Sequence, residues 1–220
     1  MRIHIIDNLR GIAFILMVIQ HAVIFYDEAH NTNYHNIDII ELAGFIARNI
    51  FIILAGYSVN LSHKKKDKNI LRKRIKRSIE IFLHALIINI TTYLLYPDQY
   101  VRFGILHFIS IGTLLISFIA PYKILTLIIF IASLLYKFPN VNPFINTITG
   151  SQVEYHMMDW FPLQKWLPVM LSGLIIGQYV NIDKLKIPLL EKASHLSLLS
   201  KNSLELYTLH FVIFALIAKL

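Results

Sequence analysis

The sequence predicts an all-α fold, a polytopic bundle of about seven transmembrane helices with a cytoplasmic N-terminus. Of its 220 residues 56% are hydrophobic and only 15% are charged, whereas soluble domains carry about 25% charged residues. Seven apolar stretches approach the roughly 20 residues that a helix needs to cross a bilayer. The ten-residue alternation of membrane barrel strands is absent, and lipid otherwise tolerates only helices.

The seven stretches are separated by polar or proline-marked breaks, and we treat residues 1–220 as one domain. The fourth and fifth are short and separated only by residues 121–123, which predicts a tight hairpin. No signal-peptide cleavage site follows the first, so we expect a retained helix. The approximate bounds are 10–26, 39–61, 79–96, 104–120, 122–138, 161–181 and 203–220.

The distribution of basic residues predicts the orientation of the bundle. Nine of the 21 Lys and Arg residues lie between Lys64 and Arg77, and cytoplasmic loops are the ones enriched in such residues. The alternating loops 27–38, 97–103 and 139–160 contain only Arg102. We therefore expect the N-terminus inside and the C-terminus outside, in a bacterial inner membrane or an internal or plasma membrane.

The same basic run has other interpretations. Anionic lipid headgroups and nucleotide phosphates both suit it, and neither excludes the topological role. Nucleic acid is not expected as a partner, because no aromatic residue lies between Leu61 and Ile81.

At the starts of predicted helices, Asp38 and Asp159 are expected N-caps, and Asn202 with Glu205 has the spacing of a capping box.

Polar side chains inside the predicted spans are candidates for function, because each costs about 2.5–3.5 kcal/mol at mid-helix. We expect Lys165 to snorkel to the interface and His84 to bond a neighbouring helix. The remaining candidates are His21, Arg48, Asn49, Asn89, His107 and His210.

One face of the first span carries Asp7, Arg10, Phe14, Met17 and His21 at helical spacing. Arg10 and His21 are eleven residues apart, about 16 Å along the axis. This arrangement suits an acyl-CoA, with its phosphates at a basic mouth and its pantetheine arm threaded into the bundle.

Three rival interpretations remain. Outer-loop residues His30, His35, His156, Asp38, Glu154 and Asp159 could bind zinc, but no HxxxH or HExxH spacing supports this, and no metal is expected. A b-type haem could be ligated by His21, His84, His107 or His210, although no convincing pair emerges. A transporter of a sugar or lipid would use a similar polar core without acyl transfer.

Five segments in order resemble a known family. They are IDNLRGIAFILMVIQH, RNIFIILAGYSVNLS, FGILHFISIGTLL, DWFPLQKWLPVMLSGLIIG and NSLELYTLH. These are similar to the transmembrane acyltransferases related to the catalytic domain of heparan-α-glucosaminide N-acetyltransferase, including bacterial relatives. The resemblance covers nearly the whole chain. It implies transfer of an acetyl group from cytoplasmic acetyl-CoA to a sugar amine or hydroxyl across the membrane.

The resemblance also implies site residues. The family's catalytic histidine corresponds to His35, and His21 falls where the lysosomal enzyme has an active-site asparagine. His21 or His35 would be the general base, and Asn49, His107 or Arg48 could stabilise the oxyanion. His107 is also a catalytic candidate. The expected substrate-binding residues are Arg10, Arg48, Asn49, Asp159 and His210, and those expected to bind coenzyme A are Arg72, Arg74 and Arg77.

The expected partners are therefore acyl-CoA, a glycan or glycolipid acceptor and the lipid bilayer, with a homodimer as one option. Acetyl transfer directly to the acceptor and transfer through an acetyl-histidine intermediate both remain open at this point.

Overall fold

The computed structural model describes residues 4–64, 68–180, 196, 199–200 and 202–220, and no strand occurs among them. The chain divides into two compact units, which are described separately. Unit 1 comprises Met1–Phe51 and Asn181–Leu220, and unit 2 comprises Ile52–Val180. The long helix α2 (Asp38–Lys64) passes from the first unit into the second.

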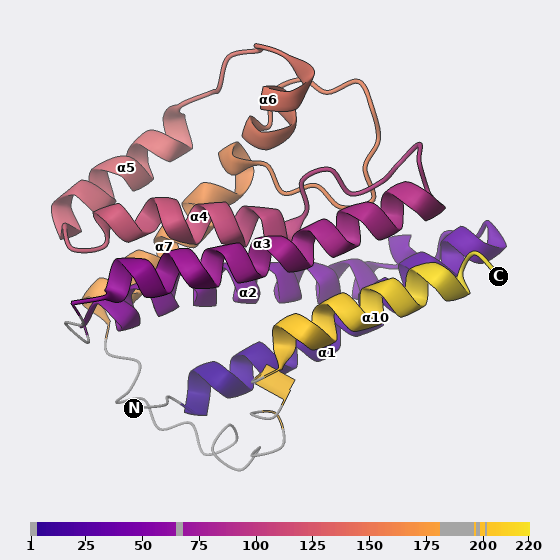
Figure 1. The fold of residues 1–220 in the computed structure, drawn as a ribbon, viewed down its shortest axis with the longest axis horizontal. Coiled ribbons are helices and arrows are strands. Elements are labelled where there is room, and N and C mark those ends of the chain that lie inside the picture. The colour runs from indigo at the N-terminus through magenta and orange to yellow at the C-terminus, as the bar shows by residue number, and fades with distance from the viewer. Residues whose placement is uncertain (1–3, 65–67, 181–195, 197–198, 201) are drawn as a thin grey trace. The chain divides into compact units, whose positions relative to one another are not determined.

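Unit 1 is built on α1 (His4–His30) and α10 (Ser203–Ile217), which run side by side in Figure 1. The short helix η1 (Tyr34–Asn36) folds back on α1. On the α1 face that the sequence predicted to suit an acyl-CoA, Asp7, Phe14 and Met17 are each less than 10% exposed. At Phe14 this face packs against His210 of α10, with ring centroids 5.7 Å apart.

Unit 2 contains α3 (Ile70–Leu95), α4 (Ile105–Ile119), α5 (Lys123–Leu135), α6 (Pro143–Thr149) and α7 (Leu163–Tyr179). Helix α3 packs along α4, where the buried hydroxyl of Ser78 donates to the Ser110 carbonyl at 2.8 Å. The second half of α2 crosses α7 at backbone contact. A Cβ on Gly173 would lie 2.0 Å from the Ile53 carbonyl oxygen, so only glycine permits this approach.

Helices α1, α2 and α3 are long and apolar enough to cross a membrane, with candidate spans Ile5–His30, Asp38–Lys64 and Ile70–Leu95. Helices α4, α5 and α10 are apolar but have only 15, 13 and 15 residues, about 20–23 Å at 1.5 Å per residue. The hydrocarbon core is about 30 Å thick. The chain is thus an all-helical membrane protein, while seven crossings and the position of the N-terminus stay predictions.

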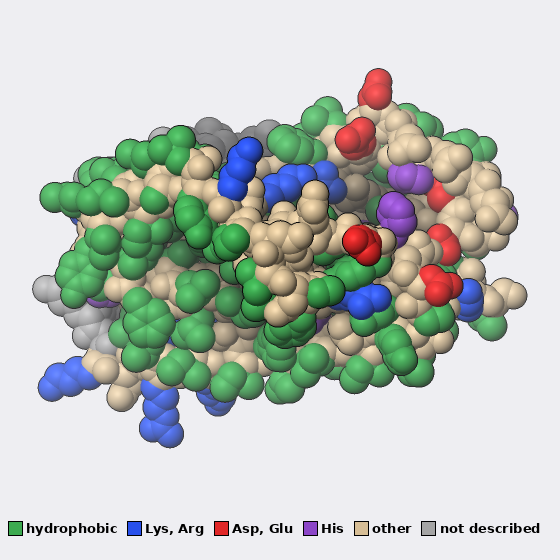
Figure 2. Space-filling model, turned by 90° about the horizontal axis from the view of Figure 1, so that it is seen from above, with side chains coloured by type: hydrophobic (Ala, Val, Ile, Leu, Met, Phe, Trp, Pro, Cys, Tyr) green, Lys and Arg blue, Asp and Glu red, His purple; other side chains and the backbone are tan. Residues whose placement is uncertain are grey.

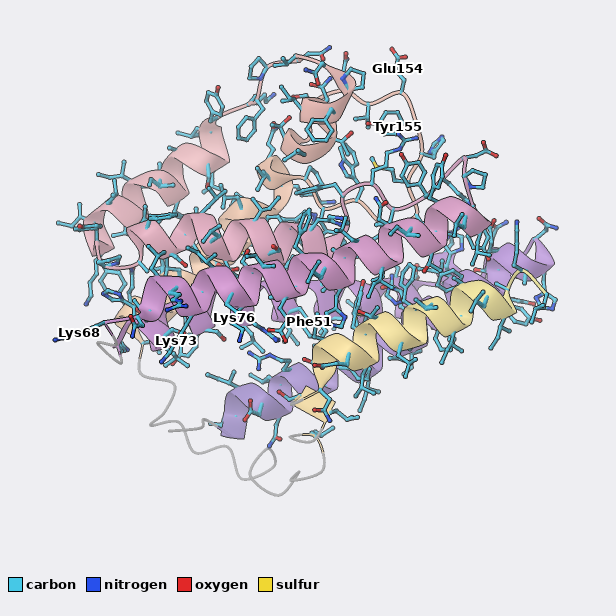
Figure 3. All side chains as sticks on the ribbon, in the orientation of Figure 1. Phe51, Lys68, Lys73, Lys76, Glu154 and Tyr155 are labelled. Carbon is cyan, nitrogen blue, oxygen red and sulfur yellow. The ribbon has the colours of Figure 1, made fainter. Side chains whose placement is uncertain are left out.

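The basic run 64–77 does not form a loop throughout, because α3 begins at Ile70. The charged residues are compatible with a helix because Lys73 and Lys76 lie on its exposed side. Arg74 is half-buried, and Ser78, one turn later, is buried. Further along, the exposed side chains become apolar. Figure 3 places Lys68, Lys73 and Lys76 where α3 starts, and Glu154 and Tyr155 in the loop at the opposite end of unit 2.

The exposed surface is dominated by apolar side chains. On α5 the residues Ile124, Ile128, Ile131, Leu134 and Leu135 are each more than half exposed. Figure 2 shows hydrophobic side chains over most of the visible face, with few acidic ones. Exposed apolar patches of this extent are rare on soluble monomers and suit a lipid environment.

The predicted caps need correction. Asp38 is the first residue of α2, inside its first turn instead of before it. Asn202 does occupy the cap position of α10, but its side chain makes no capping hydrogen bond. Asp159 is not the cap of α7, whose N-cap is Pro162. The predicted outer loop 139–160 contains α6, which begins after Asn142, whose side chain accepts the Ile145 N–H.

Candidate active site

The strongest site in unit 1 joins Asp27, in the last turn of α1, to His35 on η1. Nδ1 of His35 lies 2.8 Å from Oδ2 of Asp27. The same carboxylate accepts the N–H groups of Tyr34 at 2.9 Å and His35 at 2.6 Å, and the Thr32 hydroxyl. The five residues 31–35 therefore wrap around one carboxylate at the end of a helix, and this fixes where the imidazole lies.

Local sequence explains this wrapping. Asn31 takes a left-handed conformation, with φ 52°, which Asn tolerates better than most residues. Helix α1 therefore ends here, and the Thr32 N–H returns to the Asp27 carbonyl at 3.2 Å. The turn carries Tyr34 and His35 back over the Asp27 side chain.

The two members of the pair differ in exposure. The Asp27 side chain is 4% exposed and that of His35 is 42% exposed. Since an ionised carboxylate can only accept hydrogen bonds, Nδ1 of His35 must be the donor. In the neutral ring, Nε2 then holds a lone pair. The arrangement thus offers an oriented, accessible imidazole that can take up a proton.

A second histidine pair lies between α1 and α10. Nδ1 of His21 is 2.9 Å from Nε2 of His210, and the two rings are stacked with centroids 5.2 Å apart. Phe211 and Tyr207 meet the His21 ring edge-on, at 5.2 and 5.9 Å. Each histidine stands out by itself as a polar residue in a predicted span, and the structure brings the two together.

Three further predicted residues of unit 1 lie on α1 and α2. The positive charge of Arg48 acts on His21, and among the described residues its buried Nε has no hydrogen-bond partner. Asn49 donates its amide to the Phe45 carbonyl of its own helix at 2.8 Å. Arg10 lies 3.7 Å from the Asp7 carboxylate.

In unit 2, His107 and Asp159 meet at the start of α4. The Gly104 N–H donates to Nδ1 of His107 at 3.2 Å, and the Ile105 N–H donates to Oδ2 of Asp159 at 3.1 Å. His107 is buried, with the Phe103 ring stacked on it at 5.8 Å. Because these side chains satisfy the orphan donors of a helix N-terminus, both have a supporting role there.

The contact between Asp159 and the start of α4 joins two of the family segments, FGILHFISIGTLL and DWFPLQKWLPVMLSGLIIG. Phe103 and Trp160 form an isolated parallel bridge, and the Phe161 N–H donates to the Phe103 carbonyl at 2.9 Å. A Cβ on Gly104 would lie 2.6 Å from the Asp159 carboxylate. Position 104 must therefore be glycine, because a side chain there would collide with the Asp159 carboxylate.

The arginines predicted to hold coenzyme A lie on the first turns of α3. Arg74 donates to the carbonyls of Val59 and Ser117, at 2.6 and 3.3 Å, and so ties α3 to α2 and α4. Arg77 pairs with Glu80 at 3.0 Å. Arg72 is exposed. Of the three, Arg72 and Arg77 are on the surface, and Arg74 is engaged in helix packing.

Asp27 was not among the candidate site residues that the sequence predicted. A signal was present in the sequence: an aspartate at the end of an apolar span is followed eight residues later by a histidine in an Asn-rich loop. Within the described ranges, no group of three or more His, Cys, Asp or Glu side chains could hold a metal ion.

The fold and these pairs define an all-helical membrane protein with an oriented histidine in its first loop. The family model described as heparan-alpha-glucosaminide N-acetyltransferase, catalytic, matches residues 2–212. The chain therefore belongs to this family, which confirms the resemblance found in its motifs. Membership indicates a membrane acetyltransferase, of a family that uses acetyl-CoA as donor. No curated protein and no solved structure matches the chain.

Proposed function

We propose that this protein transfers an acetyl group from cytoplasmic acetyl-CoA to an amine or hydroxyl of a glycan on the far side of the membrane, with His35 as the general base. The observation that carries the proposal is the Asp27–His35 pair. Its carboxylate is buried, its imidazole is accessible, and the bond between them leaves Nε2 of His35 to accept a proton.

In the proposed reaction, Nε2 of His35 removes the proton from the acceptor amine or hydroxyl as that group attacks the thioester carbonyl. The tetrahedral intermediate then collapses with cleavage of the C–S bond. The departing thiolate of coenzyme A takes the proton back, and the acceptor carries the acetyl group. Asp27 stabilises the imidazolium that forms during this cycle, as a triad carboxylate does.

The proposed direction of acetyl transfer across the membrane rests on the distribution of basic and acidic residues in unit 2. The basic start of α3 and the acidic loop around Glu154 lie at opposite ends of unit 2 in Figure 3. Positive charge is typical of the cytoplasmic end, where acetyl-CoA is available. Arg72 and Arg77 are the exposed arginines on α3 that would meet its phosphates, since guanidinium groups bind phosphate with two parallel hydrogen bonds.

The test uses the full chain in proteoliposomes with radiolabelled acetyl-CoA and an oligosaccharide that ends in glucosamine. The proposal expects labelled acetyl on the oligosaccharide together with free coenzyme A, and His35→Ala should remove both. If the sugar crosses the membrane without release of coenzyme A, the protein is a transporter and the proposal is wrong.

A further inference from the structure

The hydrogen bonds of the His21–His210 pair determine which nitrogen of His21 is free to bind a substrate. Nδ1 of His210 lies 2.9 Å from the Leu206 carbonyl oxygen, one turn earlier on α10. A carbonyl can only accept, so this nitrogen must carry a hydrogen. In neutral His210 the other nitrogen, Nε2, then has a lone pair.

That lone pair faces His21. Nε2 of His210 is 2.9 Å from Nδ1 of His21, so Nδ1 of His21 is the donor and carries the hydrogen. The neutral His21 ring therefore has its own lone pair on Nε2. A main-chain carbonyl thus sets the tautomer of His210, and His210 sets the tautomer of His21.

The surroundings favour a neutral pair over a charged one. Phe14 and Phe214 meet the His210 ring edge-on, at 5.7 and 5.6 Å, and Phe211 does the same to His21 at 5.2 Å. Both His210 and the guanidinium of Arg48 act electrostatically on His21, and two cations repel each other. Within the described chain, Nε2 of His21 makes no hydrogen bond that would occupy its lone pair.

We infer that His210 is a positioning residue, which holds His21 in the Nδ1–H tautomer so that Nε2 of His21 accepts a hydrogen bond from one N–H of an amine acetyl acceptor. The identity of that donor rests on the proposed function, whereas the tautomer rests on geometry alone. One N–H of the attacking amine is then held by His21, and the proton that the amine loses is its other hydrogen, which goes to His35.

The tautomer is measured on the full chain in lipid bilayers with 15N-labelled histidine. Protonated and unprotonated ring nitrogens have well separated resonances, and His21→Asn identifies the His21 signals by their loss. In the unsubstituted protein Nε2 of His21 should be unprotonated. If Nε2 is protonated there, the inference is wrong, whatever the enzyme activity.

Three variants separate positioning from packing. His210→Phe keeps a ring but removes the acceptor, so the His21 tautomers should become mixed. His210→Gln offers an amide oxygen to Nδ1 of His21 and should restore the original tautomer. Phe211→Leu disturbs the packing on His21 without touching the hydrogen bond, so the tautomer should persist. An unchanged spectrum in His210→Phe, or the same mixture in Phe211→Leu, would overturn the inference.

Kinetics give the second readout. Loss of one oriented hydrogen bond to the acceptor should raise its KM about fivefold to tenfold in His210→Phe, with the KM for acetyl-CoA unchanged and recovery in His210→Gln. Equal losses for both substrates would argue against positioning. If the unsubstituted protein transfers no acetyl group, the proposed function fails, while the spectra still decide the tautomer.

Discussion

The two histidine pairs of unit 1 use the same geometry with different partners. In each, Nδ1 of one imidazole is held and Nε2 is left with a lone pair. The partner of His35 is a buried carboxylate, whereas the partner of His21 is a second imidazole. A carboxylate stabilises the imidazolium formed on proton uptake, and a neutral ring does so far less. This difference is the reason why we propose proton transfer for His35 and hydrogen bonding for His21.

Removal of the base should have the largest effect. His35→Ala is expected to lower kcat on the order of 10²–10⁴-fold, the usual contribution of general base catalysis. The fold should survive, because η1 is an exposed single turn. The measurement is the rate of transfer from labelled acetyl-CoA. His30→Ala is the matched control, since His30 is a nearby exposed histidine bonded to the Tyr26 carbonyl, and it should keep its rate.

Loss of the charge alone should have an effect nearly as large. Asp27→Asn keeps the size of the side chain but can no longer stabilise an imidazolium, so kcat should fall on the order of 10²–10³-fold, somewhat less than for a full triad aspartate. The KM for acetyl-CoA should change little. A variant that keeps its full rate would show that the carboxylate only shapes the loop.

His107 offers a contrast outside unit 1, because its Nδ1 accepts the N–H of Gly104 at the start of α4. His107→Leu leaves that buried donor unsatisfied and should lower the free energy of unfolding by about 1–3 kcal/mol. His107→Asn can accept the same N–H and should restore most of it. Denaturation in detergent measures both. If His107→Asn is stable but inactive, His107 has a chemical role beyond holding the start of α4.

The smallest effect concerns one hydroxyl in the loop. Thr32→Val removes one of the four hydrogen bonds that Asp27 accepts, and a single bond contributes about 0.5–1.5 kcal/mol. We expect kcat to fall less than tenfold, as measured by the same transfer assay. A loss as large as that of Asp27→Asn would mean that the loop geometry matters more than the charge.

Much of the fold followed from periodic apolar sequence. Phe14 and Met17 were predicted to share one face of α1, and both are buried there. The seven apolar stretches all lie in helices. The first turns of α3 were missed because a run of nine basic residues is typical of a loop. A helix can nevertheless keep such residues exposed on one side. Helix α6 was missed because its seven residues are too short for a periodic pattern.

The site was predicted in part. His21, His35 and His210 could be found one by one, because polar residues in spans and loops stand out. Their partners could not, since hydrogen bonds such as His21 to His210 join residues 189 apart in sequence. The N-cap prediction for Asp159 was wrong for the same reason. Asp159 lies just before α7, but its carboxylate accepts an N–H at the start of α4, 54 positions away in sequence.

The central claim is that Asp27 and His35 act as one catalytic unit. A double-mutant cycle of His35→Ala and Asp27→Asn, read as kcat for acetyl transfer, tests it most directly. Residues that act together predict that the double variant is no slower than His35→Ala alone. If the two losses instead multiply, each residue acts independently, and the assignment of the general base to this pair is contradicted.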